Sequence, residues 1–289
     1  MRKTHRAESE EEMDIKRKKE LQAIAREVRK DVLTEVYRAS SGHPGGSLSS
    51  ADILTFLYFE AMKIDPADPR KENRDRFVLS KGHAAPGLYA ALCERGFFPK
   101  EELNTLRQLG SILQGHPDME KTPGVDISTG SLGQGLSNAC GMALAAKLKK
   151  ADYKVYAITG DGELQEGQIW ESAMFAAHYK LDNLIVFSDV NGLQIDGRTA
   201  DVMNPEPVDK KFEAFGWHVQ RINGHDFDEI EAAWKKALEV KGQPHAIVCD
   251  TVKGKGVSFM ENKAGWHGKA PKAEEYEQAM KELDEGKEA

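Results

Sequence analysis

Cysteine is scarce in this chain of 289 residues, and its three cysteines lie far apart. Cys93, Cys140 and Cys249 form an odd-numbered set in apolar surroundings, which is typical of small buried residues in a reducing compartment rather than of a disulfide framework. The sequence also lacks any run near the roughly 20 apolar residues that cross a bilayer, and residues 1–20 hold no apolar segment of a secretory signal. We therefore expect a soluble, cytoplasmic protein with no membrane partner.

Positive charge is not in excess either. Lysine and arginine number 40 and aspartate and glutamate 47, so the formal net charge is −7. This balance argues against a nucleic acid as the main partner. The length of 289 residues suits one large α/β domain or two domains of about 150 residues, and a core of that size is stable without disulfides or structural metals.

Residues 8–38 are charged and free of proline, with apolar residues recurring at steps of three and four, which predicts one amphipathic helix or two in succession. A glycine-rich break over residues 40–49 is expected to end this segment. Ser50 and Asp52 then have the chemistry of helix caps, and a short strand is expected over 76–80. The apolar residues of the first helical segment are Ile15, Leu21, Ile24, Val28, Val32 and Val36.

From residue 154 onward, apolar strand-like runs alternate with helical stretches. Continuous apolar runs of this kind are typical of a parallel sheet that is covered on both faces. We predict an α/β fold with a mostly parallel sheet and helices on both faces in a domain over 41–272, with a helical N-terminal extension over 1–40 and a tail helix over 273–289. The expected strands are 154–159, 183–188, 217–222 and 245–250, and the expected helices between them are 133–150, 167–179 and 226–241.

The segment TGDGELQEG (159–167) leaves an expected strand and enters an expected helix. Asp161 lies in this segment, and Asn191 follows thirty residues later at the end of the next strand. A carboxylate, an amide oxygen and a backbone carbonyl suit magnesium or calcium, and Gly160 and Gly162 would let backbone amides approach a phosphate at the helix start. By itself, Gly-Asp-Gly is equally typical of a tight turn with an acidic cap. The matching Asn191 favours a metal–diphosphate site.

Four histidines lie in loops that contain glycine or proline, where a functional role is more frequent than core packing. Zinc binding is an alternative for such a set, but these histidines lack the short spacing of zinc ligands. Hydrogen bonding to phosphate and sugar hydroxyls fits them better. They are His43, His83, His116 and His267, whereas His225, beside a helix start, is interpreted as structural. The glycine-rich stretch 126–150 is a weak signal by itself.

Six segments together give the chain a resemblance to a known family. They are SGHPGGSLSSADIL, NRDRFVLSKGHAAPGLYA, QGHPD, PGVDISTGSLGQGLSNACGMALA, TGDGELQEGQIWES and VNGLQIDG. From about Glu20 to Lys272 the chain resembles the N-terminal, thiamine diphosphate-binding domain of transketolase. A full transketolase continues with a pyrimidine-binding domain and a C-terminal domain, so this chain is similar to the N-terminal subunit of a split transketolase.

The resemblance implies a role for each matching position. The positions that match metal ligands are Asp161, Asn191 and the Leu193 carbonyl. Those that match diphosphate contacts are Gly162, His83 and His267, and those that touch the cofactor rings are Gly130, Leu132 and Ile195. The histidines that match the lining of the substrate channel are His43, His116 and His267. The acid that matches the partner of a catalytic glutamate in another domain is Glu166.

The resemblance implies transfer of a two-carbon ketol unit from a ketose phosphate to an aldose phosphate, in the pentose phosphate pathway, with thiamine diphosphate and magnesium or calcium. It also implies activity only with a C-terminal partner subunit, which supplies the catalytic glutamate. Because an interface that encloses a cofactor must bury apolar surface, we expect the isolated subunit to expose an apolar patch and to self-associate as a two-fold dimer. Two alternatives are a subunit of another ketol or acyl transferase, such as deoxyxylulose-phosphate synthase, and a non-catalytic binding module. The GHPGGSLS and QGHPD segments favour transketolase over the first, and the complete set of cofactor-matching residues speaks against the second.

Overall fold

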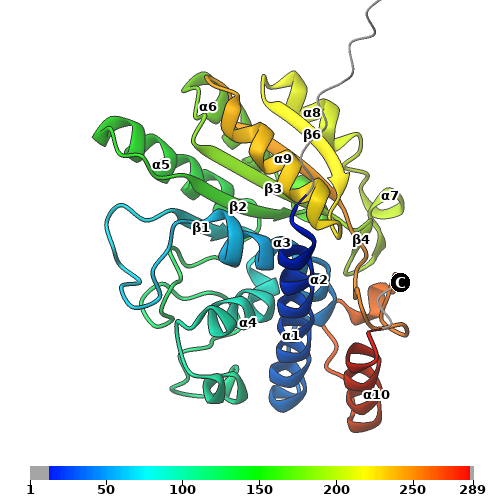
Figure 1. The fold of residues 1–289 in the computed structure, drawn as a ribbon. Helices are drawn as coiled ribbons and strands as arrows, with labels where there is room; N and C mark the ends of the chain where they lie inside the picture. Colours follow the sequence, from blue (N-terminus) through cyan, green and yellow to red (C-terminus); the bar gives the residue numbers. More distant parts are fainter. Residues whose placement is uncertain (1–12, 287–289) are drawn as a thin grey trace, which may run out of the picture.

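The computed structural model describes residues 13–286, which form a five-stranded parallel sheet with helices on both faces (Figure 1). The strand order is β1-β2-β3-β7-β6, and all neighbouring pairs are parallel. These strands are β1 (Arg76–Leu79), β2 (Val155–Gly160), β3 (Leu184–Val190), β6 (His218–Asn223) and β7 (His245–Asp250), and a small antiparallel hairpin consists of β4 (Leu193–Gln194) and β5 (Gly197–Arg198). The predicted fold class is confirmed, and each predicted strand lies within two residues of its expected bounds.

The helices lie in layers above and below the sheet (Figure 1). Those on one face are α5 (Gln134–Lys149), α6 (Gly167–His178) and α8 (Val208–Ala214). Those on the other face are α3 (Ala51–Phe56), α4 (Ala85–Arg95) and α9 (Phe227–Glu239). Helix α1 (Ile15–Ala39) packs against α3 and α4. The remaining helices are α2 (Pro44–Ser49), α7 (Thr199–Val202) and α10 (Ala273–Asp284). Single helical turns occur at Leu57–Ala61, Gly82–Ala84, Lys100–Thr105, Gly162–Gln165 and Ala264–Trp266.

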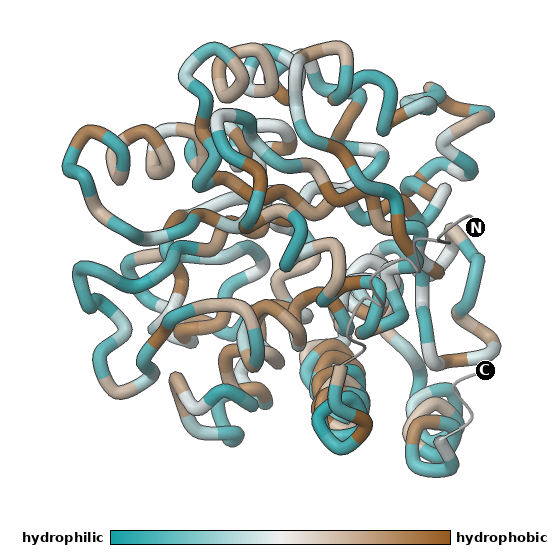
Figure 2. Tube along the Cα trace, turned by 45° about the horizontal axis from the view of Figure 1, so that its top comes forward, coloured by the Kyte–Doolittle hydropathy of each residue, from teal (hydrophilic) through white to brown (hydrophobic). Residues whose placement is uncertain are grey.

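Side chains of β2 alternate between the two faces of the sheet. Val155 and Ala157 pack with α5, α6 and α8, whereas Tyr156 and Ile158 pack with the helices of the opposite face. All four side chains are buried. In Figure 2, hydrophobic segments run through the central strands, whereas hydrophilic segments are frequent on the outer loops. A strand that is buried on both faces needs apolar residues at successive positions, which explains the continuous apolar runs of the sequence.

Helix α1 begins after Asp14, whose carboxylate accepts hydrogen bonds from the backbone N–H groups of Lys16 (3.0 Å) and Arg17 (3.1 Å). It ends at Ser40, which has a left-handed φ of 49°. Part of the predicted helix, residues 8–12, lies outside the described residues. The prediction of an irregular segment up to residue 49 is wrong from Pro44 onward, because proline at the first helical position begins α2.

The buried side of α1 is less apolar than its sequence period predicts. Ile15 is exposed, whereas the charged residues Arg29, Asp31 and Glu35 are buried. Helix α10 packs against α1, and the rings of Tyr37 and Tyr276 stack with their centroids 4.3 Å apart. Both terminal helices therefore belong to the packed body of the protein. The division of the chain at residues 40 and 272 stays a prediction.

Ser50 is the residue that precedes α3, as predicted, but its side chain makes no capping hydrogen bond, and Asp52 lies inside the helix, so the prediction of side-chain caps is wrong. The Ser50 hydroxyl donates to the Gly46 carbonyl at 2.9 Å. Asp52 is buried and accepts hydrogen bonds from Arg29 Nη1 at 3.1 Å and from His225 Nδ1 at 2.7 Å. His225 Nε2 accepts the Val252 N–H at 2.9 Å, so the ring proton lies on Nδ1. This placement agrees with the structural interpretation of His225.

Two expectations from the sequence concern disulfides and membrane-spanning helices. Cys93, Cys140 and Cys249 are buried free thiols, as predicted. Within residues 13–286, every helix is too short or too polar to cross a membrane.

Candidate active site

The predicted site residues gather at one edge of the sheet, where the carboxyl ends of the parallel strands meet. Asp161 directly follows β2, and Asn191 directly follows β3. Lys81 follows β1 and Lys253 follows β7, each within three residues of the end of its strand. A cavity of about 410 Å³, lined in part by Asn191 and Leu193, opens at the end of β3.

The turns after β2 and β3 are interlocked by hydrogen bonds. Asp161 Oδ1 accepts the Gly162 N–H at 2.8 Å, and its Oδ2 accepts the Gly192 N–H at 2.6 Å. Asn191 Oδ1 accepts the Leu193 N–H at 3.1 Å. The structure thus brings the three predicted metal ligands, Asp161, Asn191 and the Leu193 carbonyl, into one pair of turns.

The chemistry of these three groups fits a hard divalent cation. They offer a carboxylate, an amide oxygen and a backbone carbonyl, which are ligands that Mg²⁺ and Ca²⁺ prefer. Burial, together with the charge of Asp189, raises the pKa of Asp161 to about 6, so a neighbouring cation would stabilise its ionised form. No group of three or more His, Cys, Asp or Glu side chains is arranged for a metal in residues 13–286. The predicted set contains a single side chain of those types.

Two buried lysines, which the sequence analysis did not identify, lie at the same edge. Lys81 Nζ is ion-paired with the buried Asp189 and donates to the Gly46 carbonyl at 2.7 Å. Lys253 Nζ donates to the Leu193 carbonyl at 3.3 Å, and burial together with the charge of Lys81 lowers its pKa to about 8. Because Lys81 already has a carboxylate partner, Lys253 is the one of the two that is placed to meet an anion.

Three of the four predicted histidines form a cluster. The ring centroids of His83 and His267 are 5.0 Å apart, and those of His43 lie 5.3 Å from His83 and 5.5 Å from His267. Burial and nearby cationic groups lower the pKa of His43 to about 4, that of His83 to about 2 and that of His267 to about 3. All three rings are therefore neutral at pH 7. The buried Nδ1 of His267 has no hydrogen-bond partner, so it is available to a bound ligand.

The fourth histidine, His116, is exposed and lies against the glycine-rich loop. A Cβ atom at Gly130 would lie 2.8 Å from the His116 ring, and Gly130 has a φ of +145°, so only glycine fits there. The Tyr89 hydroxyl fixes the loop of His116 through the carbonyls of Gln114 and His116, each at 2.9 Å. Leu132, two residues after Gly130, is half-buried.

Glu163 is a further buried site residue that the sequence analysis missed. Its Oε1 accepts hydrogen bonds from the Ser80 hydroxyl and from the Gly133 N–H at 2.8 Å, and its Oε2 accepts the Gly160 N–H at 3.0 Å. This carboxylate joins the turn after β1, the glycine-rich loop and the turn after β2. The Gly160 amide, which was expected to approach a phosphate, is thus engaged by Glu163, as the Gly162 amide is by Asp161.

Glu166 and Ile195 lie on the outer side of the site. Glu166 is exposed at the start of α6, and Ile195 is 65% exposed in the segment between β4 and β5. Met203 after α7 is also exposed, at 63%, and its carbonyl accepts a hydrogen bond from Gln165 Nε2 at 2.7 Å, beside Glu166. This side of the site therefore offers apolar surface next to a carboxylate.

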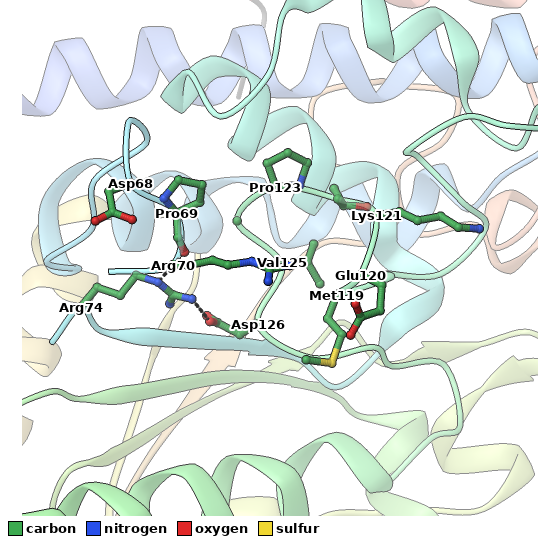
Figure 3. Close-up of a pocket in the computed structure, with 12 residues that line it drawn as sticks. Asp68, Pro69, Arg70, Arg74, Met119, Glu120, Lys121, Pro123, Val125 and Asp126 are labelled. Carbon is green, nitrogen blue, oxygen red and sulfur yellow. Dashed lines mark hydrogen bonds and ion pairs between the residues drawn. The ribbon is translucent and has the colours of Figure 1, made fainter. Parts of the chain in front are cut away.

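A cavity of about 560 Å³ lies elsewhere, near the amino end of β1, and none of the predicted site residues lines it (Figure 3). Arg74 in this cavity is ion-paired with Asp126 and donates to the Pro69 carbonyl at 2.7 Å. These polar groups find their partners within the protein. Volume alone therefore does not make this cavity a functional site.

Comparison with known proteins agrees with the geometry of the edge. Residues 20–287 match the family described as transketolase, thiamine diphosphate binding domain. The chain belongs to the transketolase family.

Several relatives of similar length are named as transketolase subunits. The chain is 49% identical over 265 residues to the 6-deoxy-6-sulfo-D-fructose transketolase subunit SqwG of Clostridium sp. (strain MSTE9), covering 92% of this chain and 96% of that protein. It is 47% identical over 257 residues to an apulose-4-phosphate transketolase subunit of Phocaeicola vulgatus, covering 89% and 91% respectively. The predicted N-terminal subunit of a two-component transketolase is confirmed.

Single-chain transketolases are more than twice as long. The chain is 43% identical over 277 residues to human transketolase and covers 44% of it. The crystal structure of transketolase from Campylobacter jejuni superposes with a TM-score of 0.88 at 38% identity, over 94% of this chain and 43% of that one. The transketolase subunit therefore corresponds to less than half of these enzymes.

Proposed function

We propose that this subunit binds thiamine diphosphate with Mg²⁺ or Ca²⁺ at the edge described above and, with a C-terminal subunit, transfers a two-carbon ketol unit from a ketose phosphate to an aldose phosphate. The observation that carries the proposal is the joint placement of Asp161, Asn191, the Leu193 carbonyl and Lys253 at that edge. When bound, thiamine diphosphate supplies the nucleophilic carbon and the electron sink for cleavage of a carbon–carbon bond. The residues of this chain would bind the cofactor, orient the substrate and hold protons.

The diphosphate and the metal would be held together. Asp161, Asn191 and the Leu193 carbonyl would ligate the cation, while His83, His267 and the Gly162 turn would contact the diphosphate. If a metal ion binds the Leu193 carbonyl, the Lys253 ammonium can donate its hydrogen bond to the diphosphate instead. Gly130, Leu132 and Ile195 would contact the cofactor rings.

The substrate would meet the neutral histidines. His43 and His267 would hydrogen-bond the oxygen whose proton is lost as the carbon–carbon bond breaks, and His116 would bond the terminal hydroxyl of the two-carbon fragment. A neutral imidazole has one donor and one acceptor, so the two rings together can hold a hydroxyl in either protonation state. The low pKa values of His43 and His267 keep both rings in that form at pH 7.

The partner subunit would cover the outer side of the site, where Glu166 would pair with the partner's catalytic glutamate. The exposed apolar side chains of Ile195 and Met203 lie on this side and favour a buried contact there. We also propose two-fold self-association of the chain, a role in the pentose phosphate pathway and a cytoplasmic location. The buried free thiols agree with a reducing compartment.

Titration calorimetry with thiamine diphosphate tests the cofactor site. We expect binding in the presence of Mg²⁺ and little binding in the presence of a chelator. Without the ion, one carboxylate and neutral oxygens cannot neutralise the negative charge of a diphosphate. Asp161→Ala should abolish the metal-dependent part. Asp152→Ala is the matched control, because Asp152 is exposed and lies just before the amino end of β2, away from the site. Equal affinity with and without metal would refute the metal assignment.

Activity measurements test the two-component enzyme. The chain alone should show no ketol transfer from xylulose 5-phosphate to ribose 5-phosphate and should gain it when mixed with its partner subunit. Robust turnover by the chain alone would contradict the proposal. The donor panel should include apulose 4-phosphate and 6-deoxy-6-sulfofructose, which the names of relatives mention.

Two histidine variants separate cofactor binding from turnover. His83→Ala should weaken the affinity for thiamine diphosphate. His116→Ala should leave this affinity nearly intact and lower turnover about a hundredfold. Loss of cofactor affinity alone in both variants would contradict the placement of His116 in the substrate channel.

A further inference from the structure

Arg107 lies beside His43 and has no role in the site as described so far. Its Nη2 is 3.3 Å from His43 Nδ1, and its Nη1 donates to the Ser41 hydroxyl at 2.8 Å. A guanidinium group has donors and no acceptor. Nδ1 of His43 must therefore accept this hydrogen bond, which places the proton of the neutral ring on Nε2.

The loop around Arg107 is shaped to hold the guanidinium in this place. Arg107 has a left-handed φ of 61°, which is unfavourable for a residue other than glycine. Its backbone N–H donates to the Leu113 carbonyl at 2.8 Å. A Cβ atom at Gly115 would lie 3.3 Å from Arg107 Nε, so glycine gives the guanidinium room. Backbone strain that the surrounding structure maintains is typical of a residue whose side chain has a functional role.

We propose that Arg107 is a positioning residue that holds His43 as the neutral Nε2–H tautomer, so that His43 donates a hydrogen bond to the substrate oxygen. The substrate part of this inference rests on the proposed function, whereas the tautomer of His43 does not. A ring fixed in this form stabilises negative charge as it develops on that oxygen. It leaves acceptance of the proton to another group.

The surroundings of His43 support the neutral ring. The rings of His83 and His267 face it, and the charges that act on it are those of Arg107, His116 and Lys253. All of these groups are basic, so a second proton on His43 would be repelled. Burial and the charge of Arg107 accordingly lower the pKa of His43 to about 4.

Nitrogen NMR of the isolated chain with ¹⁵N-labelled histidine rings tests the tautomer, with His43→Gln assigning the signals. Between pH 6 and 8 the wild-type ring should carry its proton on Nε2 alone. Arg107→Met should give a mixture of tautomers and raise the pKa of His43. Arg107→Gly should do the same, and because glycine accepts the left-handed φ, this variant guards against misfolding. Arg70→Met, at an exposed arginine of the cavity in Figure 3, is the control and should change nothing.

Kinetics of the assembled enzyme test the positioning role. Both Arg107 variants should lower kcat about tenfold to a hundredfold, with little change in KM or in the Kd of thiamine diphosphate. A rise in KM confined to phosphorylated acceptors would assign Arg107 to phosphate binding and overturn the proposal. A wild-type ring with its proton on Nδ1, or one that the variants leave unchanged, would also overturn it. Absence of ketol transfer by the wild-type complex would contradict the proposed function instead, and the NMR result would still decide the tautomer.

Discussion

Replacing Glu35 with methionine should stabilise this transketolase subunit, and the gain should grow with pH. Glu35 lies on α1 and is completely buried, and neither of its carboxylate oxygens has a hydrogen-bond partner. Burial, together with the charge of Asp31, raises the pKa of Glu35 well above its ordinary value. The other titratable groups that sense its charge are Tyr89 and Cys93 on α4.

The expected gain follows from these orphaned oxygens. A buried polar group without a partner costs about 1–3 kcal/mol, and methionine fills a similar volume without polar oxygens, so the variant should gain about that amount. A carboxyl group whose folded pKa lies above its unfolded value adds stability below the unfolded value, here 4.5, and this contribution is lost as the pH rises through the folded pKa. The wild type should therefore lose stability from pH 4.5 upward, and the variant should lose less of it.

Urea unfolding at pH 5 and pH 8 measures both effects. The difference between Glu35→Met and the wild type should be larger at pH 8. Asp31, whose pKa burial raises to about 7, titrates in the same direction in both proteins and does not create this difference. Glu20→Met, on the exposed side of the same helix, is the control and should change stability by less than about 0.5 kcal/mol. A destabilised Glu35→Met at pH 8, or an equal gain at both pH values, would refute the reasoning.

Three further variants probe the buried groups of the site. Glu163→Ala removes the acceptor of one hydroxyl and two backbone amides, so it should lower the free energy of unfolding by about 3 kcal/mol and weaken thiamine diphosphate binding in calorimetry; unchanged affinity would contradict its role in holding the loops. Lys253→Met should raise the Kd of thiamine diphosphate at least about tenfold in saturating Mg²⁺ without destabilising the free chain, whereas the exposed Lys263→Met should match the wild type. Asp189→Asn leaves the Lys81 charge buried without its carboxylate, which should cost about 3–5 kcal/mol in urea unfolding; a loss below about 1 kcal/mol would mean that water reaches the lysine.

The sheet could be predicted from the sequence because strands that are buried on both faces must be apolar at successive positions. Helix α2 could not be predicted in the same way. Gly45 and Gly46 are poor helix formers, so the sequence argues against a helix although Pro44 favours a helix start. The close approach of Trp266 explains why glycine occupies position 45, because a Cβ atom there would lie 2.9 Å from the Trp266 carbonyl. Tertiary packing, which the local sequence does not contain, decides this segment.

The candidate site was predictable where its residues end neighbouring strands. Asp161 and Asn191 had to lie close together because β2 and β3 are adjacent and parallel. The roles of Lys253, Glu163 and Arg107 depend instead on burial and on loops that come from distant parts of the chain. A lysine, a glutamate or an arginine in the sequence looks like surface charge. Only the folded chain shows that these three are held against carbonyl, amide and imidazole groups.

The charge balance of the edge explains why metal and cofactor should bind together. Asp161, Glu163 and Asp189 are buried with Lys81 and Lys253, so three negative charges face two positive ones when all five groups are ionised. A divalent cation alone would add unbalanced positive charge to this buried place, and a diphosphate alone would add unbalanced negative charge, which is costly in a low-dielectric interior. Bound together they largely cancel. Each should therefore raise the affinity of the other by the same factor, as linkage requires, and calorimetry of each in the absence and presence of the other measures that factor.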